Sequence, residues 1–296
     1  MTPNLRGASL MVLAMTLFAL EDACFKAVTK TTPPGIGTMI FGLGGLIVFA
    51  LWTRAAGERV WTPAYLSPVM LVRSGFEIMG RLFFALALAF APLATTSAIL
   101  QAATLVVTLG AALFLGERVG LRRWIAMAVG FAGVVLILRP GAEAFEPTLI
   151  FAVLGMIGFS GRDLATRASP PSLSLRQLGV PGFAVVLVAG LIIATVQGDW
   201  RLPDATAALL LCGTILAGVC AYTALSGAMR SGDVSVVAPF RYSRLLVALV
   251  LAVLLFDERP DTLALIGATL IVTSGLYTLL RSRAGARRGS GVSRRP

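Results

Sequence analysis

Ten stretches of about 20 mostly apolar residues follow one another along this chain of 296 residues. A helix of about that length crosses the hydrocarbon core of a bilayer, where unpaired backbone groups are too costly to leave exposed. The pattern therefore predicts an all-α integral membrane protein with ten transmembrane helices. The predicted spans are 8–28, 35–53, 69–91, 93–115, 123–139, 148–168, 177–197, 205–229, 234–256 and 262–281.

The composition supports a membrane protein and excludes several kinds of chemistry. Charged residues make up 13% of the chain, against roughly 25% in a typical soluble domain. The sequence has no histidine and no glycine-rich loop that ends in Lys-Ser or Lys-Thr, which argues against histidine-based catalysis and ATP hydrolysis. Cys24, Cys212 and Cys220 lack the spacing of metal ligands or redox pairs. We therefore expect no catalytic residue, no metal and no cofactor.

The first apolar segment could be mistaken for a secretory signal. Its uninterrupted run from Ala8 to Leu20 has the length of a signal-peptide core. However, Glu21 and Asp22 stand where the small residues of a cleavage site would lie. We therefore expect this segment to be retained as a transmembrane helix.

Basic residues are distributed unevenly between the two sides of the predicted membrane. With the N-terminus inside, nine basic residues of the loops and six arginines of the tail, fifteen in all, lie on the inner side, against four on the outer side. The positive-inside rule then predicts a multi-pass protein of the cell inner membrane with both termini cytoplasmic. Residues 282–296 are expected to form a disordered basic tail close to anionic lipid, and no motif suggests nucleic-acid binding.

The chain repeats itself weakly with an offset of 141 residues. Gly116-Glu117-Arg118 closes the fourth span and Asp257-Glu258-Arg259 closes the ninth. The same offset relates Asp22 to Asp163 and Lys26 to Arg167. Each half holds five spans, so the second half enters the membrane from the opposite side. Two inverted repeats, 1–141 and 146–281, are therefore predicted, as in carriers that alternate access around a central site.

These features resemble the drug/metabolite transporter superfamily, in particular its ten-helix EamA-type branch. The similarity extends over residues 8–281 and is carried by short stretches in both halves. These are 91–98, 115–118 and 130–140 in the first half, and 232–239, 257–260 and 267–280 in the second. The resemblance implies a basket of ten helices around a central cavity. It also implies secondary transport of metabolites such as amino acids, nucleosides or vitamins, with relatives that carry riboflavin or S-adenosylmethionine.

The chain departs from this family at one point. Such transporters often carry a proline midway along the fourth and ninth spans. Here Ala103 and Arg244 stand near those positions, and Pro239 lies earlier. The sequence therefore gives no signal for a helix break at these places.

Ionisable residues inside the predicted spans are the candidate site residues, because each costs at least about 2.5–3.5 kcal/mol to insert. The third span places Arg73, Glu77 and Arg81 on one helical face, where Glu77 and Arg81 either line the cavity or satisfy each other. In the first span Asp22 can pair with Lys26, whereas Glu21 points elsewhere. The candidate set also includes Arg162 and Asp163 in the sixth span, with Asp163 able to pair with Arg167.

The ninth span carries the arginines to which the sequence gives most weight. Arg241 and Arg244 are three residues apart, and Arg244 lies close to the expected midplane. No acid lies beside them in this span, so they need Glu77, Asp22 or Asp163, or an anionic ligand. We expect Arg244→Gln to abolish transport and leave folding intact. Gln101 and Tyr222 are further candidates, either as substrate contacts or as helix–helix hydrogen bonds. Tyr242 completes the candidate site, as a ring that either stacks on an aromatic ligand or packs against neighbouring helices.

Counting these charges favours an anionic or zwitterionic small-molecule substrate. Six bases face four acids inside the predicted spans, and the acids could also bind protons and couple transport to a proton gradient. Two other functions remain open. A membrane-embedded lipid-modifying enzyme would need histidine, paired aspartates or a metal site, and an ion channel would need a filter-like loop. A secondary transporter of a small organic metabolite is the function that the sequence favours.

Overall fold

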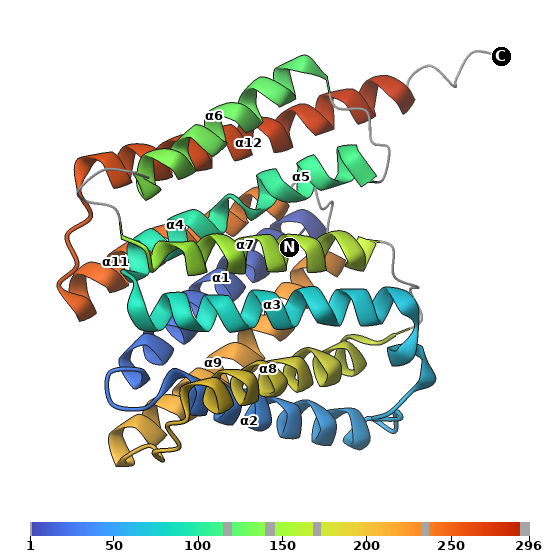
Figure 1. Ribbon diagram of the computed structural model, residues 1–296. Helices are drawn as coiled ribbons and strands as arrows, with labels where there is room; N and C mark the ends of the chain where they lie inside the picture. The colour runs from blue at the N-terminus through green and yellow to red at the C-terminus, as the bar shows by residue number, and fades with distance from the viewer. Residues whose placement is uncertain (1, 115–119, 140–145, 168–172, 232–236, 291–296) are drawn as a thin grey trace.

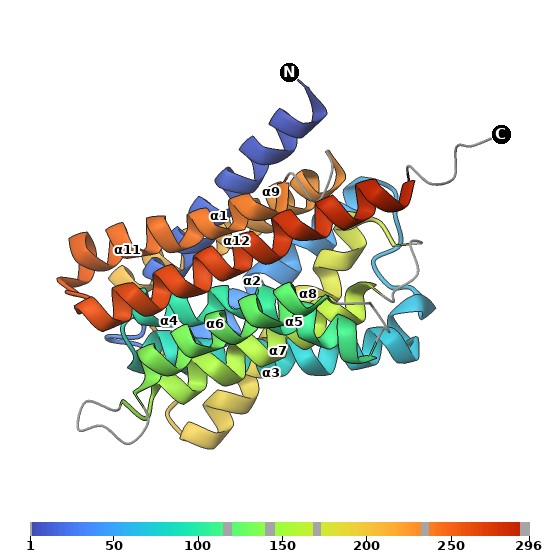
Figure 2. The same ribbon diagram turned by 90° about the horizontal axis from the view of Figure 1, so that it is seen from above.

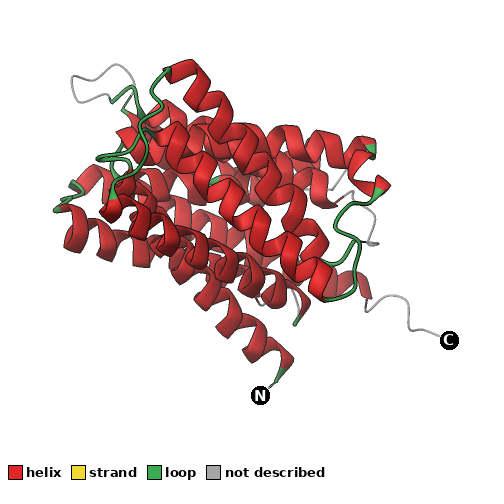
Figure 3. Ribbon diagram, turned by 90° about the horizontal axis from the view of Figure 1, so that it is seen from below, coloured by secondary structure: helices red, strands yellow, loops and turns green. Residues whose placement is uncertain are grey.

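The computed structural model describes residues 2–114, 120–139, 146–167, 173–231 and 237–290. Within these residues all regular secondary structure is helical, and the loops lie at the two ends of the bundle (Figures 1 and 3). The elements are α1 (Pro3–Val28), α2 (Pro34–Ala55), η1 (Pro63–Leu66), α3 (Pro68–Phe90), α4 (Leu93–Gln101), α5 (Ala103–Phe114), α6 (Leu121–Leu138), α7 (Leu149–Arg167), α8 (Leu175–Gln197), α9 (Ala205–Arg230), η2 (Ala238–Tyr242), α11 (Ser243–Phe256) and α12 (Thr262–Ser290).

Helices lie at all ten predicted spans, and two of these spans are interrupted. The fourth consists of α4 and α5, separated at Ala102, and in the ninth the 3₁₀ helix η2 precedes α11. The breaks occur beside Ala103 and Arg244, although neither position carries a proline. The start of the predicted ninth span, residues 234–236, lies outside the described residues.

Helix starts follow local sequence signals. Proline, which lacks the N–H that would be unpaired in a first turn, begins α1, α2 and α3. Ser174 and Gln177 form a capping box at α8, and Asp204 accepts a hydrogen bond from the N–H of Ala207 at α9. Pro92, between α3 and α4, cannot continue the ladder of α3, so the chain turns there and starts a new helix.

The helices pair across the two repeats with approximate two-fold symmetry. Helix α2 packs against α8, α6 against α12 and α4 against α11, so that each helix meets its own counterpart. The same two-fold rotation carries the α1–α9 pair onto the α7–α3 pair, which is also in contact. In Figure 1, α6 and α12 lie side by side at the top and α2 and α8 at the bottom. The ten-helix membrane fold with two inverted five-helix repeats is thus confirmed.

Glycine allows the closest of these contacts. A Cβ added to Gly133 of α6 would lie 2.7 Å from the carbonyl oxygen of Gly267 of α12, and one added to Gly267 would lie 2.7 Å from that of Gly133. Glycines of α2, α3, α7 and α8 touch opposing backbone in the same manner. Small residues at these crossings let helices approach and gain dispersion contacts, which is the main attraction available within lipid.

The outer surface is apolar, as a lipid-facing surface should be. Large aliphatic and aromatic side chains such as Phe114, Val196, Leu209 and Leu254 are among the most exposed in the protein. Four charged side chains inside the spans, Glu21, Asp22, Arg73 and Glu77, are by contrast buried. Among the described residues, five helical stretches, one of them α4 and α5 together, are long and apolar enough to cross a membrane by length and composition alone, and α6 and α12 contain shorter apolar segments.

The two ends of the chain extend beyond the predicted spans. The start of α1 projects from the bundle (Figure 2). Helix α12 continues to Ser290, so the first part of the predicted disordered tail is helical in the structure. Residues 291–296 lie outside the described residues.

Candidate functional site

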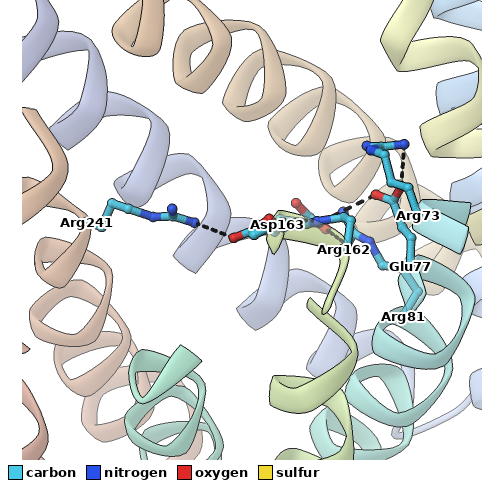
Figure 4. A network of polar contacts seen from close by, with 7 residues as sticks. Arg73, Glu77, Arg81, Arg162, Asp163 and Arg241 are labelled. Carbon is cyan, nitrogen blue, oxygen red and sulfur yellow. Dashed lines mark hydrogen bonds and ion pairs between the residues drawn. The ribbon is translucent and has the colours of Figure 1, made fainter. Parts of the chain in front are cut away.

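A chain of five charged side chains crosses the interior between α3, α7 and η2. Arg73 and Glu77, one turn apart on α3, are 3.1 Å apart (Nη1 to Oε2). The other oxygen of Glu77 lies 3.4 Å from Nη1 of Arg162 on α7, and Arg162 also binds its neighbour Asp163 at 2.8 Å. Asp163 faces Arg241 of η2, with Oδ2 and Nη2 3.6 Å apart. Figure 4 shows this network with Arg241 at one end and Arg73 at the other.

Charge pairing extends through the whole network. Among the described residues, its three arginines share the carboxylates of Glu77 and Asp163. Glu77 and Arg73 are almost fully buried. Because a charge at membrane depth is expensive unless it is paired, an anion would be attracted to the end of the network where an arginine is most exposed.

Arg241 is the loosely held member of the network. Its side chain is 34% exposed, and it approaches Asp163 without a hydrogen bond to any side chain in the described part of the protein. Asp163 is already held by Arg162, which donates to it from Nε at 2.9 Å and from Nη2 at 2.8 Å. The forked donors of Arg241 are therefore available to a carboxylate or phosphate.

The broken helices position Arg241. Gln101, the last residue of α4, donates from Nε2 to the backbone oxygen of Arg241 at 3.1 Å. The hydroxyl groups of Thr104 and Tyr242 are 2.7 Å apart. The two helix breaks therefore contact each other. Gln101 and Thr104, at the break between α4 and α5, bind the backbone of Arg241 and the hydroxyl of Tyr242 in η2.

Asp22 and Arg244 form a second, closed arrangement between α1 and α11. Arg244 donates to Oδ2 of Asp22 from Nη2 at 2.6 Å and from Nε at 3.1 Å. The rings of Phe18 and Phe84 lie 5.2 and 5.6 Å from the guanidinium carbon. Asp22 is only 2% exposed. Arg244 therefore holds Asp22 through two donor nitrogens and also contacts two aromatic rings.

Glu21 and Arg81 form a third pair, between α1 and α3, at 3.3 Å. The guanidinium lies between the rings of Phe41 and Phe159, at 5.9 and 5.6 Å. The second oxygen of Glu21, Oε2, is buried without a hydrogen-bond partner among the described residues. Glu21 is therefore only half satisfied.

The remaining candidates are divided between the interior and one end of the bundle. Tyr222 of α9 packs edge-on against Phe49, with ring centroids 5.4 Å apart, and lies within electrostatic reach of Arg162. Lys26 lies at the end of α1, away from the network, where it pairs with Glu258 at 3.6 Å.

Two of the pairings that the sequence allowed, Asp22–Lys26 and Glu77–Arg81, do not form, whereas Arg244 pairs with Asp22, one of the three acids expected for it. Asp163 contacts Arg162 and Arg241. Glu77 contacts Arg73 and Arg162, whereas Arg81 reaches Glu21 on another helix. Neighbours on one helix meet in Arg73–Glu77 and Arg162–Asp163, whereas Asp22 and Arg81 find oppositely charged groups on other helices. The side chain of Arg167 lies outside the described residues.

Sequence reasoning missed the residues that support the charges. Phe18 and Phe84 enclose Arg244, and Thr104 holds Tyr242. Of these residues, only Thr104 could have been found from the sequence, because it lies one helical turn after the candidate Gln101. Glu258, at the end of the ninth span, accepts hydrogen bonds from the N–H groups of Leu93 and Ala94.

A separate groove of about 230 Å³ lies between α4, α6, α11 and α12. Its walls are aliphatic side chains and threonines, including Ile137, Leu245, Leu249 and Val272. None of the charged candidates lines it. The groove therefore belongs to the apolar part of the bundle.

Comparison with known protein families identifies the family to which this chain belongs. The model of the EamA-like transporter family matches residues 5–139 and matches a second time over residues 147–280. The chain belongs to the EamA-like transporter family. The double match agrees with the inverted repeats seen in the fold, and the membership agrees with a polar interior inside an apolar bundle.

Curated relatives of this EamA-like protein are named as transporters of small molecules. An S-adenosylmethionine uptake transporter of Rickettsia bellii is 27% identical over 71% of this chain and 72% of its own length. A riboflavin transporter of Rhizobium johnstonii is 28% identical over 92% of this chain and 90% of its own. A pseudopaline exporter of Pseudomonas aeruginosa is 28% identical over 94% and 97%. These names support a small-molecule transporter and differ in substrate and direction.

A crystal structure of a similar fold supports the helix arrangement. It superposes with a TM-score of 0.64 at 21% identity and covers 94% of this chain and 98% of that one. At this identity the similarity concerns the fold alone.

Proposed function

We propose that this protein is a secondary carrier that moves a small organic anion or zwitterion across the bacterial inner membrane by alternating access, with both termini cytoplasmic. It is not proposed to be an enzyme. The observation that carries the substrate class is Arg241, a partly exposed guanidinium at the end of the network that lies 3.6 Å from Asp163 and donates no side-chain hydrogen bond among the described residues. The positive-inside distribution of loop arginines supports the orientation.

The position of the network supports a carrier. Its members come from α3 in the first repeat and from α7 and η2 in the second, and Gln101 of the first repeat holds the backbone of Arg241, so the site joins the two repeats. A ligand shifts a conformational equilibrium only through contacts that differ between the two states. An anion bound to Arg241 would compete with Asp163 and would thereby change a contact between η2 and α7.

The substrate site proposed here centres on Arg241 and Asp163. Arg162 holds Asp163, while Gln101 and Tyr242 fix the backbone and ring beside Arg241. Tyr222 provides an aromatic surface near Arg162. If transport is proton-coupled, the half-satisfied carboxylate of Glu21 is where the proton would bind.

The test is counterflow in liposomes, which requires no knowledge of transport direction. Purified protein would be loaded with amino acids, nucleosides, riboflavin and S-adenosylmethionine, and each labelled compound would then be added outside. The wild type is expected to accumulate at least one of them. Arg241→Gln should lower the initial rate roughly 10- to 100-fold, because a hydrogen-bonded charge contact is lost.

The matched control removes an arginine outside the membrane. Arg201 is 73% exposed and pairs only with nearby Asp199 among the described residues. Arg201→Gln should transport at the wild-type rate. Equal rates in the Arg241 and Arg201 variants would overturn the assignment of the site. Lipid turnover by the purified protein, or single-channel currents, would replace the carrier by the enzyme or channel alternative.

A further inference from the structure

The ammonium group of Lys26 lies in a pocket of oxygen atoms at one end of the bundle. Its Nζ is 2.6 Å from the backbone oxygen of Ala91 and 3.4 Å from that of Leu88. Oε1 of Glu258 lies 3.6 Å away. Two carbonyls and a carboxylate thus surround one cation, and both charged side chains are about 15% exposed.

The carbonyl groups are available because of the sequence that follows α3. In a continuing helix the oxygen of Leu88 would accept from the N–H of residue 92, but that residue is Pro92, which has none. The oxygen of Ala91 lies at the C-cap, beyond the last helical residue. Unpaired carbonyl groups at a helix C-terminus carry partial negative charge, which favours a cation.

Glu258 is held rigidly beside these carbonyls. Its Oε1 accepts from the N–H of Leu93 at 2.8 Å and its Oε2 from that of Ala94 at 3.0 Å, at the start of α4. The carboxylate is therefore fixed by α4 and does not depend on Lys26 for its position. The three oxygens form a preorganised site that resembles the helix-end carbonyls and carboxylates used by carriers for Na⁺.

We propose that this pocket is a latent monovalent-cation site and that Lys26 is a tethered cation that fills it. The same position joins the ends of α1, α3 and α11 and the start of α4, so both repeats meet there. Closure of this end of the bundle then requires a positive charge among the oxygens. The wild type supplies that charge from its own chain, whereas a variant without the ammonium group should take it from the medium as Na⁺.

The first test measures stability and needs no substrate. Lys26→Ala would be purified and melted in NaCl and in choline chloride of equal concentration. Na⁺ should raise the Tm of the variant by about 2–4 °C relative to choline, and the wild type should show no difference. Lys26→Ser serves as a second variant, since its hydroxyl adds a ligand.

Two controls separate the site from a general salt effect. Lys30 lies beside the same Phe256 ring as Lys26, at 5.0 Å against 5.6 Å, so Lys30→Ala removes a comparable charge without opening the pocket. It should show no Na⁺ effect. Lys26→Ala combined with Glu258→Gln should lose the effect, because the carboxylate is gone. Equal melting of both Lys26 variants in the two salts, or unfolding in both, would overturn the proposal.

The second test uses transport and rests on the proposed carrier function. Counterflow by Lys26→Ala should fall at least about 10-fold in choline and recover in NaCl, while the wild type is unaffected. If the Tm of Lys26→Ala depends on Na⁺ but the wild type shows no counterflow, the carrier function is contradicted and the cation site stands. If the wild type shows counterflow but the Tm of Lys26→Ala does not respond to Na⁺, the carrier function stands and the cation site is contradicted.

Discussion

The pairs Asp22–Arg244 and Asp163–Arg241 differ although their acids are related by the repeat. Asp22 and Asp163 are 141 residues apart, the offset of the repeat. Asp22 receives two hydrogen bonds from Arg244 and is buried with it between two aromatic rings. Asp163 is held by its neighbour Arg162 and faces Arg241 at 3.6 Å. We call Asp22–Arg244 the closed pair, because its two side chains are joined by hydrogen bonds, and Asp163–Arg241 the open pair, because Arg241 keeps donors free for a ligand.

The repeat explains how the difference arises. Subtracting 141 from 244 gives position 103, which is an alanine, so the first half has no counterpart of Arg244. Asp163 therefore lacks the arginine that its symmetry would supply, and it takes a looser partner from η2. The closed pair neutralises itself, whereas the open pair leaves donors for a ligand. Divergence at a single repeat-related position thus separates a structural pair from a candidate binding pair.

The largest expected effect comes from breaking the closed pair. Arg244→Gln leaves the Asp22 carboxylate buried without its partner, which typically costs about 3–5 kcal/mol. We therefore expect a large loss of folded protein, measured by size-exclusion profile and Tm in detergent. The sequence alone predicted intact folding with lost transport, because it gave no sign that Arg244 is enclosed.

A double variant sharpens this prediction. Asp22→Asn together with Arg244→Gln removes both charges and should recover much of the lost stability, since no uncompensated charge remains. Additive losses in the double variant would show that the two side chains do not act as a pair. A folded, transport-deficient Arg244→Gln would favour the original site assignment.

The sequence predicted the fold well because the signals for membrane helices are long and redundant. Apolar length, the proline breaks and the repeat each pointed to ten helices in two inverted halves. The candidate charges were also found, since an ionisable residue in an apolar span is conspicuous. The sequence named Asp22 as one of three possible acids for Arg244 but could not choose among them, because Asp22 and Arg244 are 222 residues apart and meet only through the packing of α1 against α11. The break near Ala103 also lacks a local sequence signal, whereas Pro239 lies in the first turn of η2, shortly before Arg244.

A smaller effect is expected at the support of the open pair. Tyr242→Phe removes the hydroxyl that lies 2.7 Å from that of Thr104 and should loosen the position of Arg241. Loss of one neutral hydrogen bond is worth about 0.5–1.5 kcal/mol, so KM in counterflow should rise roughly 2- to 10-fold with a smaller change in kcat. Tyr277→Phe, on an exposed position of α12, is the matched control and should leave both unchanged. A change in kcat alone would place Tyr242 in the transport motion and not in binding.

The smallest effect is expected at the ion pair between Glu58 and Arg176, which lies outside the membrane. This pair is less important for stability because it is more exposed than Asp22–Arg244. Hydrogen bonds from Arg176 and from Ser174 lower the pKa of Glu58 below its ordinary value of 4.5. A lowered pKa in the folded state means that the stabilisation is present above the unfolded pKa and is lost as the pH falls through the folded value. Glu58→Gln should therefore lower Tm slightly at neutral pH and make little difference well below about pH 4. A loss of stability as large as that of Arg244→Gln would contradict the view that burial, and not pairing as such, sets the importance of these charges.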